Sequence, residues 1–166
     1  MISEREVMEQ GRIIAYCGKG IGKTSAALGT GIKAAGLGKQ VYVVQFMKGQ
    51  LSNDFLDKLE PEIKIFRFEQ SVDSFDDMTE AERAEERKNY TNALNFAKKA
   101  LTTGECDVLI LDEILGVIEE KIAGENEVLD ILKSKSMFTD IILTGINISK
   151  DIKEACDVVY SISREK

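Results

Sequence analysis

The chain contains 166 residues, of which 43% are hydrophobic, and it carries a net charge of −7. This length and apolar content predict one domain, residues 1–166, built around a single core. The negative charge disfavours a general nucleic-acid-binding role and attachment to anionic membranes. The sequence has no histidine, so carboxylates, lysines, metals or cofactors must carry any chemistry.

The cysteines favour a reduced, cytoplasmic protein. Cys17, Cys106 and Cys156 are odd in number and far apart, and no CxxC pair occurs. We interpret all three as small buried side chains. The N-terminal residues lack the apolar core of a signal peptide, and no apolar run approaches the ~20 residues that span a bilayer. We therefore expect no membrane association.

Short runs rich in β-branched and aromatic residues alternate with helical patterns along the chain. The first run is followed by an alanine-rich stretch whose apolar residues have helical spacing. A charged stretch at 78–102 predicts a long helix with apolar positions toward its end. The predicted strands are residues 12–17, 40–46, 63–68, 107–112, 139–144 and 157–162.

Strands that alternate with helices predict an α/β fold with a mainly parallel sheet flanked by helices. In such sheets the ligand site lies beyond the carboxyl ends of the strands. Two long connections, 47–62 and 69–77, follow predicted strands and can overhang that edge. We expect these connections to be substrate loops.

A glycine-rich segment, GKGIGKT, follows the first predicted strand and opens the first predicted helix, as in a P-loop. Its glycines let backbone amides face phosphate oxygens, while Lys23 supplies charge to the terminal phosphates and Thr24 reaches Mg²⁺. The motif predicts a P-loop nucleotide-binding, RecA-like architecture that binds Mg-ATP. An ordinary glycine-rich turn is the alternative, and Cys17 stands where the general pattern has glycine. The predicted phosphate-binding residues are Gly18, Lys19, Gly20, Ile21, Gly22, Lys23, Thr24 and Ser25.

Charged residues also follow two other predicted strands. Asp112 and Glu113 end an apolar run and are expected at the same sheet edge, where a carboxylate meets magnesium in nucleotide-binding sheets. A solvated helix start is the alternative. Lys48 follows the second predicted strand and can complete a positive cradle for polyphosphate, or lie on the surface.

Three segments together resemble the ATP:corrinoid adenosyltransferase family, also called cob(I)alamin adenosyltransferases. They are the compact GxGxGKT loop, the VVQFMKG block at 43–49 and the acidic pair that ends DVLILDE. The VVQFMKG block discriminates best, because P-loops in general lack it. The later Thr144-Gly145 pair also looks like the family pattern.

The resemblance implies that a Co(I) corrinoid attacks the C5′ carbon of ATP and that triphosphate leaves. Lys23 and Lys48 are then the catalytic cations around the triphosphate. Thr24 and Glu113 are implied to hold Mg²⁺, with Asp112 supporting them.

The resemblance also implies an aromatic surface for the corrinoid after the third strand. Phe68 and Phe75 are the nearest matches, although the segment lacks the family's usual tryptophan. Core packing is the alternative, above all for Phe68. A homodimer and an electron-donating flavoprotein partner are implied in the same way.

Two departures from the family pattern leave other functions open. Ile146 stands where the family commonly has arginine, and the family's C-terminal motif has no counterpart before Lys166. We expect the second departure to weaken nucleotide or corrinoid affinity, or to mark a member with another role. The alternatives are a P-loop ATPase or small-molecule kinase, and a non-catalytic ATP- or corrinoid-binding module.

Overall fold

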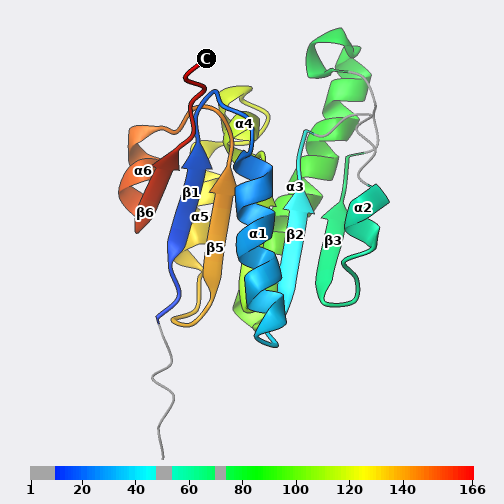
Figure 1. The fold of residues 1–166 in the computed structure, drawn as a ribbon. Coiled ribbons are helices and arrows are strands. Elements are labelled where there is room, and N and C mark those ends of the chain that lie inside the picture. Colours follow the sequence, from blue (N-terminus) through cyan, green and yellow to red (C-terminus); the bar gives the residue numbers. More distant parts are fainter. Residues whose placement is uncertain (1–9, 48–53, 70–73) are drawn as a thin grey trace, which may run out of the picture.

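The computed structural model describes residues 10–47, 54–69 and 74–166. Its centre is a six-stranded sheet with the order β3-β2-β4-β5-β1-β6, in which every neighbouring pair is parallel (Figure 1). All strands therefore end at one edge, the upper edge in Figure 1. The strands are β1 (Ile13–Cys17), β2 (Val41–Gln45), β3 (Ile63–Arg67), β4 (Val108–Asp112), β5 (Asp140–Thr144) and β6 (Val158–Ser161).

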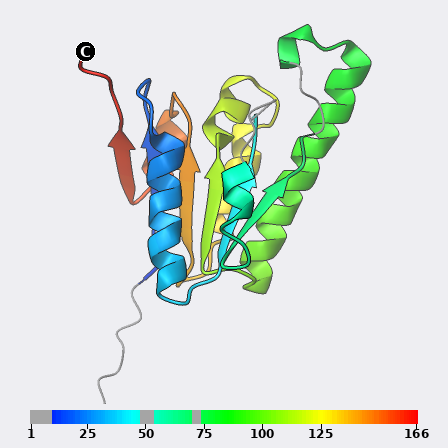
Figure 2. The same cartoon turned by 45° about the vertical axis from the view of Figure 1, so that its right-hand side comes forward.

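Helices cover both faces of the sheet. One face carries α1 and α2, and the other carries α3 to α6, as the two ribbon views show (Figures 1 and 2). The helices are α1 (Lys23–Gly36), α2 (Asp54–Asp57), α3 (Glu80–Thr103), α4 (Ile114–Glu119), α5 (Glu125–Lys133) and α6 (Lys150–Ala155), with a 3-10 turn η1 (Phe75–Asp77) before α3. Among the described residues, no helix is both long enough and apolar enough to cross a bilayer.

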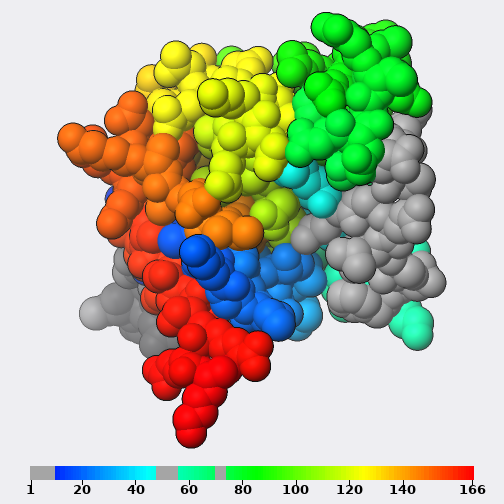
Figure 3. Space-filling model, turned by 90° about the horizontal axis from the view of Figure 1, so that it is seen from above, coloured from blue at the N-terminus to red at the C-terminus, as the bar shows by residue number. Residues whose placement is uncertain are grey.

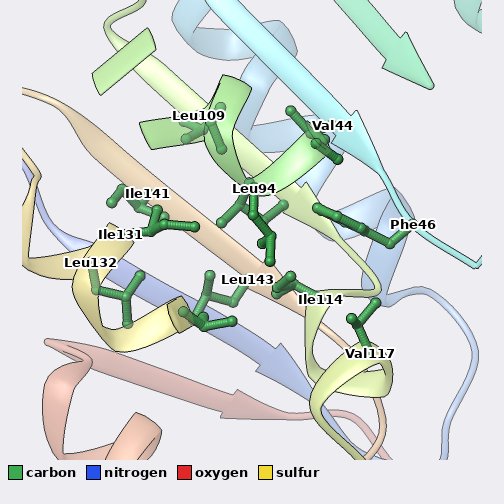
Figure 4. Packing of buried hydrophobic residues seen from close by; sticks show 14 of the residues in the cluster. Val44, Phe46, Leu94, Leu109, Ile114, Val117, Ile131, Leu132, Ile141 and Leu143 are labelled. Atoms are coloured by element: carbon green, nitrogen blue, oxygen red, sulfur yellow. The ribbon is translucent and has the colours of Figure 1, made fainter. Parts of the chain in front are cut away.

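The central strands are apolar throughout because each of their faces meets a helix layer. In β4, Leu109 and Leu111 join the core under α3 to α6, whereas Ile110 joins the core under α1. This alternation follows from the two-residue period of a strand. Figure 4 shows Leu94 of α3 packed among side chains from the first of these cores. Helices pack on both faces of the sheet, so the carboxyl edge is rigidly supported.

The predicted α/β fold with a parallel sheet is confirmed, and every observed strand lies within its predicted range. The long helix predicted at 78–102 is α3, Glu80–Thr103. The short helices α2, α4, α5 and α6 had no predicted positions. Of the two expected substrate loops, 48–53 and 70–73 lie outside the described residues, and the described parts include α2 and η1.

Candidate active site

The glycine-rich loop joins β1 to α1 at the carboxyl edge of the sheet. Gly18 and Gly22 have φ angles of 109° and 112°, in the region that favours glycine. A Cβ on Gly18 would lie only 2.4 Å from the carbonyl oxygen of Ile162, so this position also lacks space for a side chain. Two glycines of the motif are thus required by the backbone itself.

Backbone hydrogen bonds fix the shape of this loop. The N–H of Gly18 donates to the carbonyl of Ile146 at 2.8 Å, and the N–H of Gly20 donates to the carbonyl of Ile162 at 2.9 Å. Viewed from above the edge, the blue loop lies beside the red C-terminal residues and the orange segment that follows β5 (Figure 3). Ile146, the departure from the family's arginine, contributes through its backbone, which any residue can supply.

The first turn of α1 is suited to an anion. Its N-cap, Gly22, makes no side-chain capping hydrogen bond, and the first turn contains no acidic residue. Free amides and the positive end of the helix dipole attract phosphate at such a terminus. The side chain of Lys23 lies over the loop and donates to the carbonyl of Gly20 at 2.8 Å. Lys19, Ile21 and Ser25 of the predicted phosphate site are exposed at the same edge.

Thr24 connects the loop to the end of β4. Its hydroxyl donates to Oδ1 of Asp112 at 2.9 Å, although β5 separates β1 from β4 in the sheet. The prediction that Asp112 emerges beside the glycine-rich loop agrees with this contact. A hydroxyl and a carboxylate therefore meet next to the loop amides.

Asp112 is fully buried and receives further hydrogen bonds. The hydroxyl of Thr144, at the end of β5, donates to Oδ1 at 2.7 Å, and the amide of Gln45, at the end of β2, donates to Oδ2 at 3.3 Å. Gln45 is itself held by Arg67, whose Nε donates to its oxygen at 2.7 Å. Four strands thus contribute to one polar network at the carboxyl edge.

Glu113, the residue after Asp112, lies at a sharp bend of the backbone. Its φ is 66°, and its N–H donates to the hydroxyl of Thr144 at 2.7 Å. The bend ends β4 and begins α4, and leaves the Glu113 side chain half-buried at the edge. Thr144 thereby contacts the carboxylate of Asp112 and the backbone of Glu113. In the sequence, Thr144 stands out only as part of a family pattern, although a hydroxyl residue at the end of a strand beside β4 is a signal for such a role.

Three further predicted site residues follow β2 and β3 in the chain. Lys48 lies outside the described residues. Phe68 is partly buried and packs on Phe96 of α3, with ring centroids 5.6 Å apart. Phe75 is also partly buried, and the guanidinium groups of Arg83 and Arg87 lie 5.6 and 5.4 Å from its ring centroid.

The cysteines lie in the surroundings expected for structural residues. Cys17 and Cys106 are buried and Cys156 is partly buried, and all three are free thiols. Burial, together with adjacent acidic residues, raises the pKa of the Cys106 thiol to about 12. Cys17 ends β1, and its thiol donates to the carbonyl of Tyr160 at 3.5 Å. The glycine of the general loop pattern is therefore replaced by a residue that packs beneath the loop.

Comparison with known proteins points to one family. A sequence model described as "ATP:corrinoid adenosyltransferase BtuR/CobO/CobP" matches residues 9–166. The chain is 34% identical to a corrinoid adenosyltransferase of Escherichia coli (strain K12) over 93% of this chain and 77% of that protein. It is 32% identical to the corrinoid adenosyltransferase CobA of Salmonella typhimurium, with the same coverage of each chain.

A solved structure of low sequence identity also has this fold. The KaiC-like protein PH0186 of Pyrococcus horikoshii superposes with a TM-score of 0.61 at 18% identity, covering 95% of this chain and 74% of that one. At this identity the similarity concerns the fold alone, which is the P-loop, RecA-like architecture that the sequence predicts.

Proposed function

This chain belongs to the ATP:corrinoid adenosyltransferase family, and we propose that its glycine-rich loop presents Mg-ATP to a reduced corrinoid at the carboxyl edge of the sheet. The reaction transfers the 5′-deoxyadenosyl group of ATP to cobalt. The electron pair of Co(I) forms the bond to C5′, the C5′–oxygen bond breaks, and triphosphate leaves with the bonding electrons. Since the corrinoid is the nucleophile, the step requires no general base from a chain without histidine.

The contact between Thr24 and Asp112 is the observation that best supports our assignment of this reaction to particular residues. It brings a P-loop hydroxyl and a buried carboxylate together, beside amides that can bind phosphate. We place the triphosphate of ATP on Lys23 and on the loop amides after Gly20, because the N–H groups of Gly18 and Gly20 already donate to carbonyls. Lys23 would exchange its contact with the Gly20 carbonyl for the phosphates. Lys48, two residues after Phe46 in the chain, is proposed as a second cation.

These groups act on the leaving triphosphate. Donors and cations that are already in place stabilise developing charge without reorganising at the moment of reaction. The loop satisfies this condition because Ile146 and Ile162 already hold its backbone. The chain's main catalytic contribution is therefore to bind and orient triphosphate.

The oxygen donors at this edge also fit Mg²⁺, which prefers hard oxygen ligands. We propose that the Thr24 hydroxyl and the Glu113 carboxylate hold the ion. Asp112 would support them from its buried position, since it accepts a hydrogen bond from Thr24 and shares Thr144 with the Glu113 backbone. Bound there, Mg²⁺ would neutralise part of the charge on triphosphate.

Phe75 and Phe68 are the proposed corrinoid contacts. Both follow β3 at the carboxyl edge, and Phe75 is held by Arg83, whose Nε donates to the Phe75 carbonyl at 2.9 Å. A Phe75→Ala substitution should raise the KM for the corrinoid and leave that for ATP unchanged. Equal changes in both constants would contradict the assignment.

Three further proposals concern the oligomeric state, the electron donor and the cellular location of the enzyme. The family resemblance supports a homodimer and a flavoprotein that supplies the reducing electron, and the free thiols support a reduced, cytoplasmic location. Analytical ultracentrifugation tests the dimer. Replacing chemical reductant by reduced flavodoxin or a flavin reductase tests the electron donor.

Anaerobic turnover tests the proposed function. The protein is mixed with Mg-ATP and chemically reduced cob(I)alamin, and the cobalt–carbon product and the phosphates are separated by chromatography. We expect adenosylcobalamin together with intact triphosphate. Lys23→Ala should abolish the product, whereas Lys33→Ala, on the exposed side of the same helix, should not.

Two other results would overturn this proposal. Orthophosphate released without corrinoid would indicate the ATPase or kinase alternative, which family membership does not favour. Tight ATP binding without any adenosylated product would indicate a non-catalytic binding module.

A further inference from the structure

A buried polar cluster lies where α3 passes the carboxyl ends of β2 and β3. Tyr90, Glu86 and Asn89 of α3 are only 5%, 3% and 8% exposed. The amide of Asn89 donates to Glu86 at 3.3 Å. Burying polar groups is costly unless they are hydrogen-bonded, so a cluster at this depth calls for an explanation beyond core packing. The proposed triphosphate network centred on Asp112 does not include these residues.

Tyr90 contacts the chain segments that follow two neighbouring strands. Its ring stacks on Phe46, directly after β2, with centroids 6.0 Å apart and planes inclined by 11°. Its hydroxyl donates to Oε1 of Glu69, just after β3, at 3.5 Å. One side chain thus joins the exits of β2 and β3.

The residue after Phe46 has an uncommon backbone conformation. Met47 has a φ of 51°, in the left-handed region that residues other than glycine rarely adopt. Such a conformation persists where surrounding contacts hold it. The ring of Tyr90 holds Phe46, the preceding residue, so Tyr90 helps to set the direction in which the chain leaves β2.

The hydroxyl of Tyr90 remains protonated at working pH. Burial raises its pKa first of all, and the charges of Glu69 and Glu86 raise it further. A neutral hydroxyl can donate to Glu69. This link therefore persists across the pH range in which the enzyme is assayed.

We propose that Tyr90 is a positioning residue for adenosyl transfer, whose ring on Phe46 and hydroxyl on Glu69 hold the exit of β2 relative to the exit of β3. The inference rests on the proposed function. There, Lys48 follows Met47 and acts on the triphosphate, while Phe68 precedes Glu69 and contacts the corrinoid. Tyr90 then links the ATP side of the reaction to the corrinoid side, and touches neither substrate.

A Tyr90→Phe substitution tests this role because it keeps the stacked ring and removes only the hydroxyl. We expect kcat to fall about 10- to 100-fold, since small misplacements of reacting groups cost rates of this order. Both KM values should change by less than about threefold, because an interaction that matters mainly in the transition state affects kcat. Circular dichroism should show an unchanged fold.

Tyr42→Phe is the matched control. Tyr42 is 7% exposed and belongs to the same core, but its hydroxyl makes no hydrogen bond to the part of the chain that the structure describes. It should keep the wild-type kcat. Equal losses in the two variants, or wild-type kcat in Tyr90→Phe, would overturn the inference about Tyr90. Failure of the proposed function would look different, because the wild-type protein itself would then form no adenosylcobalamin.

Discussion

At the scale of single residues, the negative charge of Asp112 makes both of its carboxylate oxygens hydrogen-bond acceptors. Thr24 and Thr144 donate to one oxygen, and Gln45 donates to the other. In Asp112→Asn, an amide nitrogen in place of Oδ2 would face the Gln45 donor, which Arg67 keeps from flipping, and in place of Oδ1 it would require both threonine hydroxyls to accept instead of donating. We expect a loss of about 1–3 kcal/mol in unfolding free energy by urea denaturation. We also expect a drop of about 10- to 100-fold in kcat/KM for Mg-ATP.

A second substitution separates these two effects. Adding Gln45→Glu to Asp112→Asn provides an acceptor for both the new amide and Arg67, so the hydrogen-bond network closes again. Stability should recover while activity stays low, because the negative charge has moved away from Thr24. Recovery of both quantities would show that Asp112 acts only through packing and hydrogen bonds.

At the scale of elements, α3 begins with a capping box that can be tested alone. Thr79 accepts from the N–H of Glu82, whose side chain accepts from the N–H of Thr79. Thr79→Ala should lower stability by about 1 kcal/mol and the melting temperature by about 2–4 °C. The same change at Thr91, inside the helix, should be neutral or slightly stabilising, because alanine has the higher helix propensity. Scanning calorimetry measures both.

The capping box also has a defined pH dependence. Hydrogen bonds from Thr79 lower the pKa of Glu82 below its ordinary value of 4.5. A depressed carboxyl pKa contributes stability that is fully present above the ordinary pKa and is lost as the pH falls through the lowered one. The difference between Thr79→Ala and wild type should therefore shrink below about pH 4.5. A constant difference down to pH 3 would contradict this account.

Sequence patterns predicted long or fully buried elements well and short ones poorly. β4 has the mostly apolar sequence VLILD because helices cover both of its faces. In α3, the helix is long enough for a helical period to be recognised. By contrast, α4 has six residues and follows an N-cap, Glu113, with a left-handed backbone, which no periodicity reveals. The sequence does not reveal the role of Tyr90 for a related reason. Its position marks it as a core residue of a helix, while its contacts with Phe46 and Glu69 join two distant segments of the chain.

At the scale of the whole molecule, burial should protect the thiols as long as the fold is intact. Burial and neighbouring acids raise the pKa of Cys106 to about 12 and that of Cys156 to about 11, while Cys17 is 6% exposed. Because the thiolate is the reactive form, native protein should react with a thiol reagent at least about 100-fold more slowly than unfolded protein. Mass spectrometry of labelled peptides assigns each site. Rapid labelling of Cys17 in the native protein would contradict its structural role.

Binding of Mg-ATP should stabilise the whole chain by mass action. At a concentration 100 times Kd, a ligand that binds only the folded state adds about 2.7 kcal/mol. For a domain of this size, that corresponds to a rise of about 5–10 °C in the melting temperature. Chelating the magnesium should remove most of the rise if Thr24 and Glu113 hold the ion. Lys23→Ala should also reduce it, and Lys33→Ala should keep it. An equal rise with and without Mg²⁺ would contradict the metal assignment, and no rise at all would contradict the nucleotide site. Since no corrinoid is present, the experiment tests ATP binding separately from adenosyl transfer.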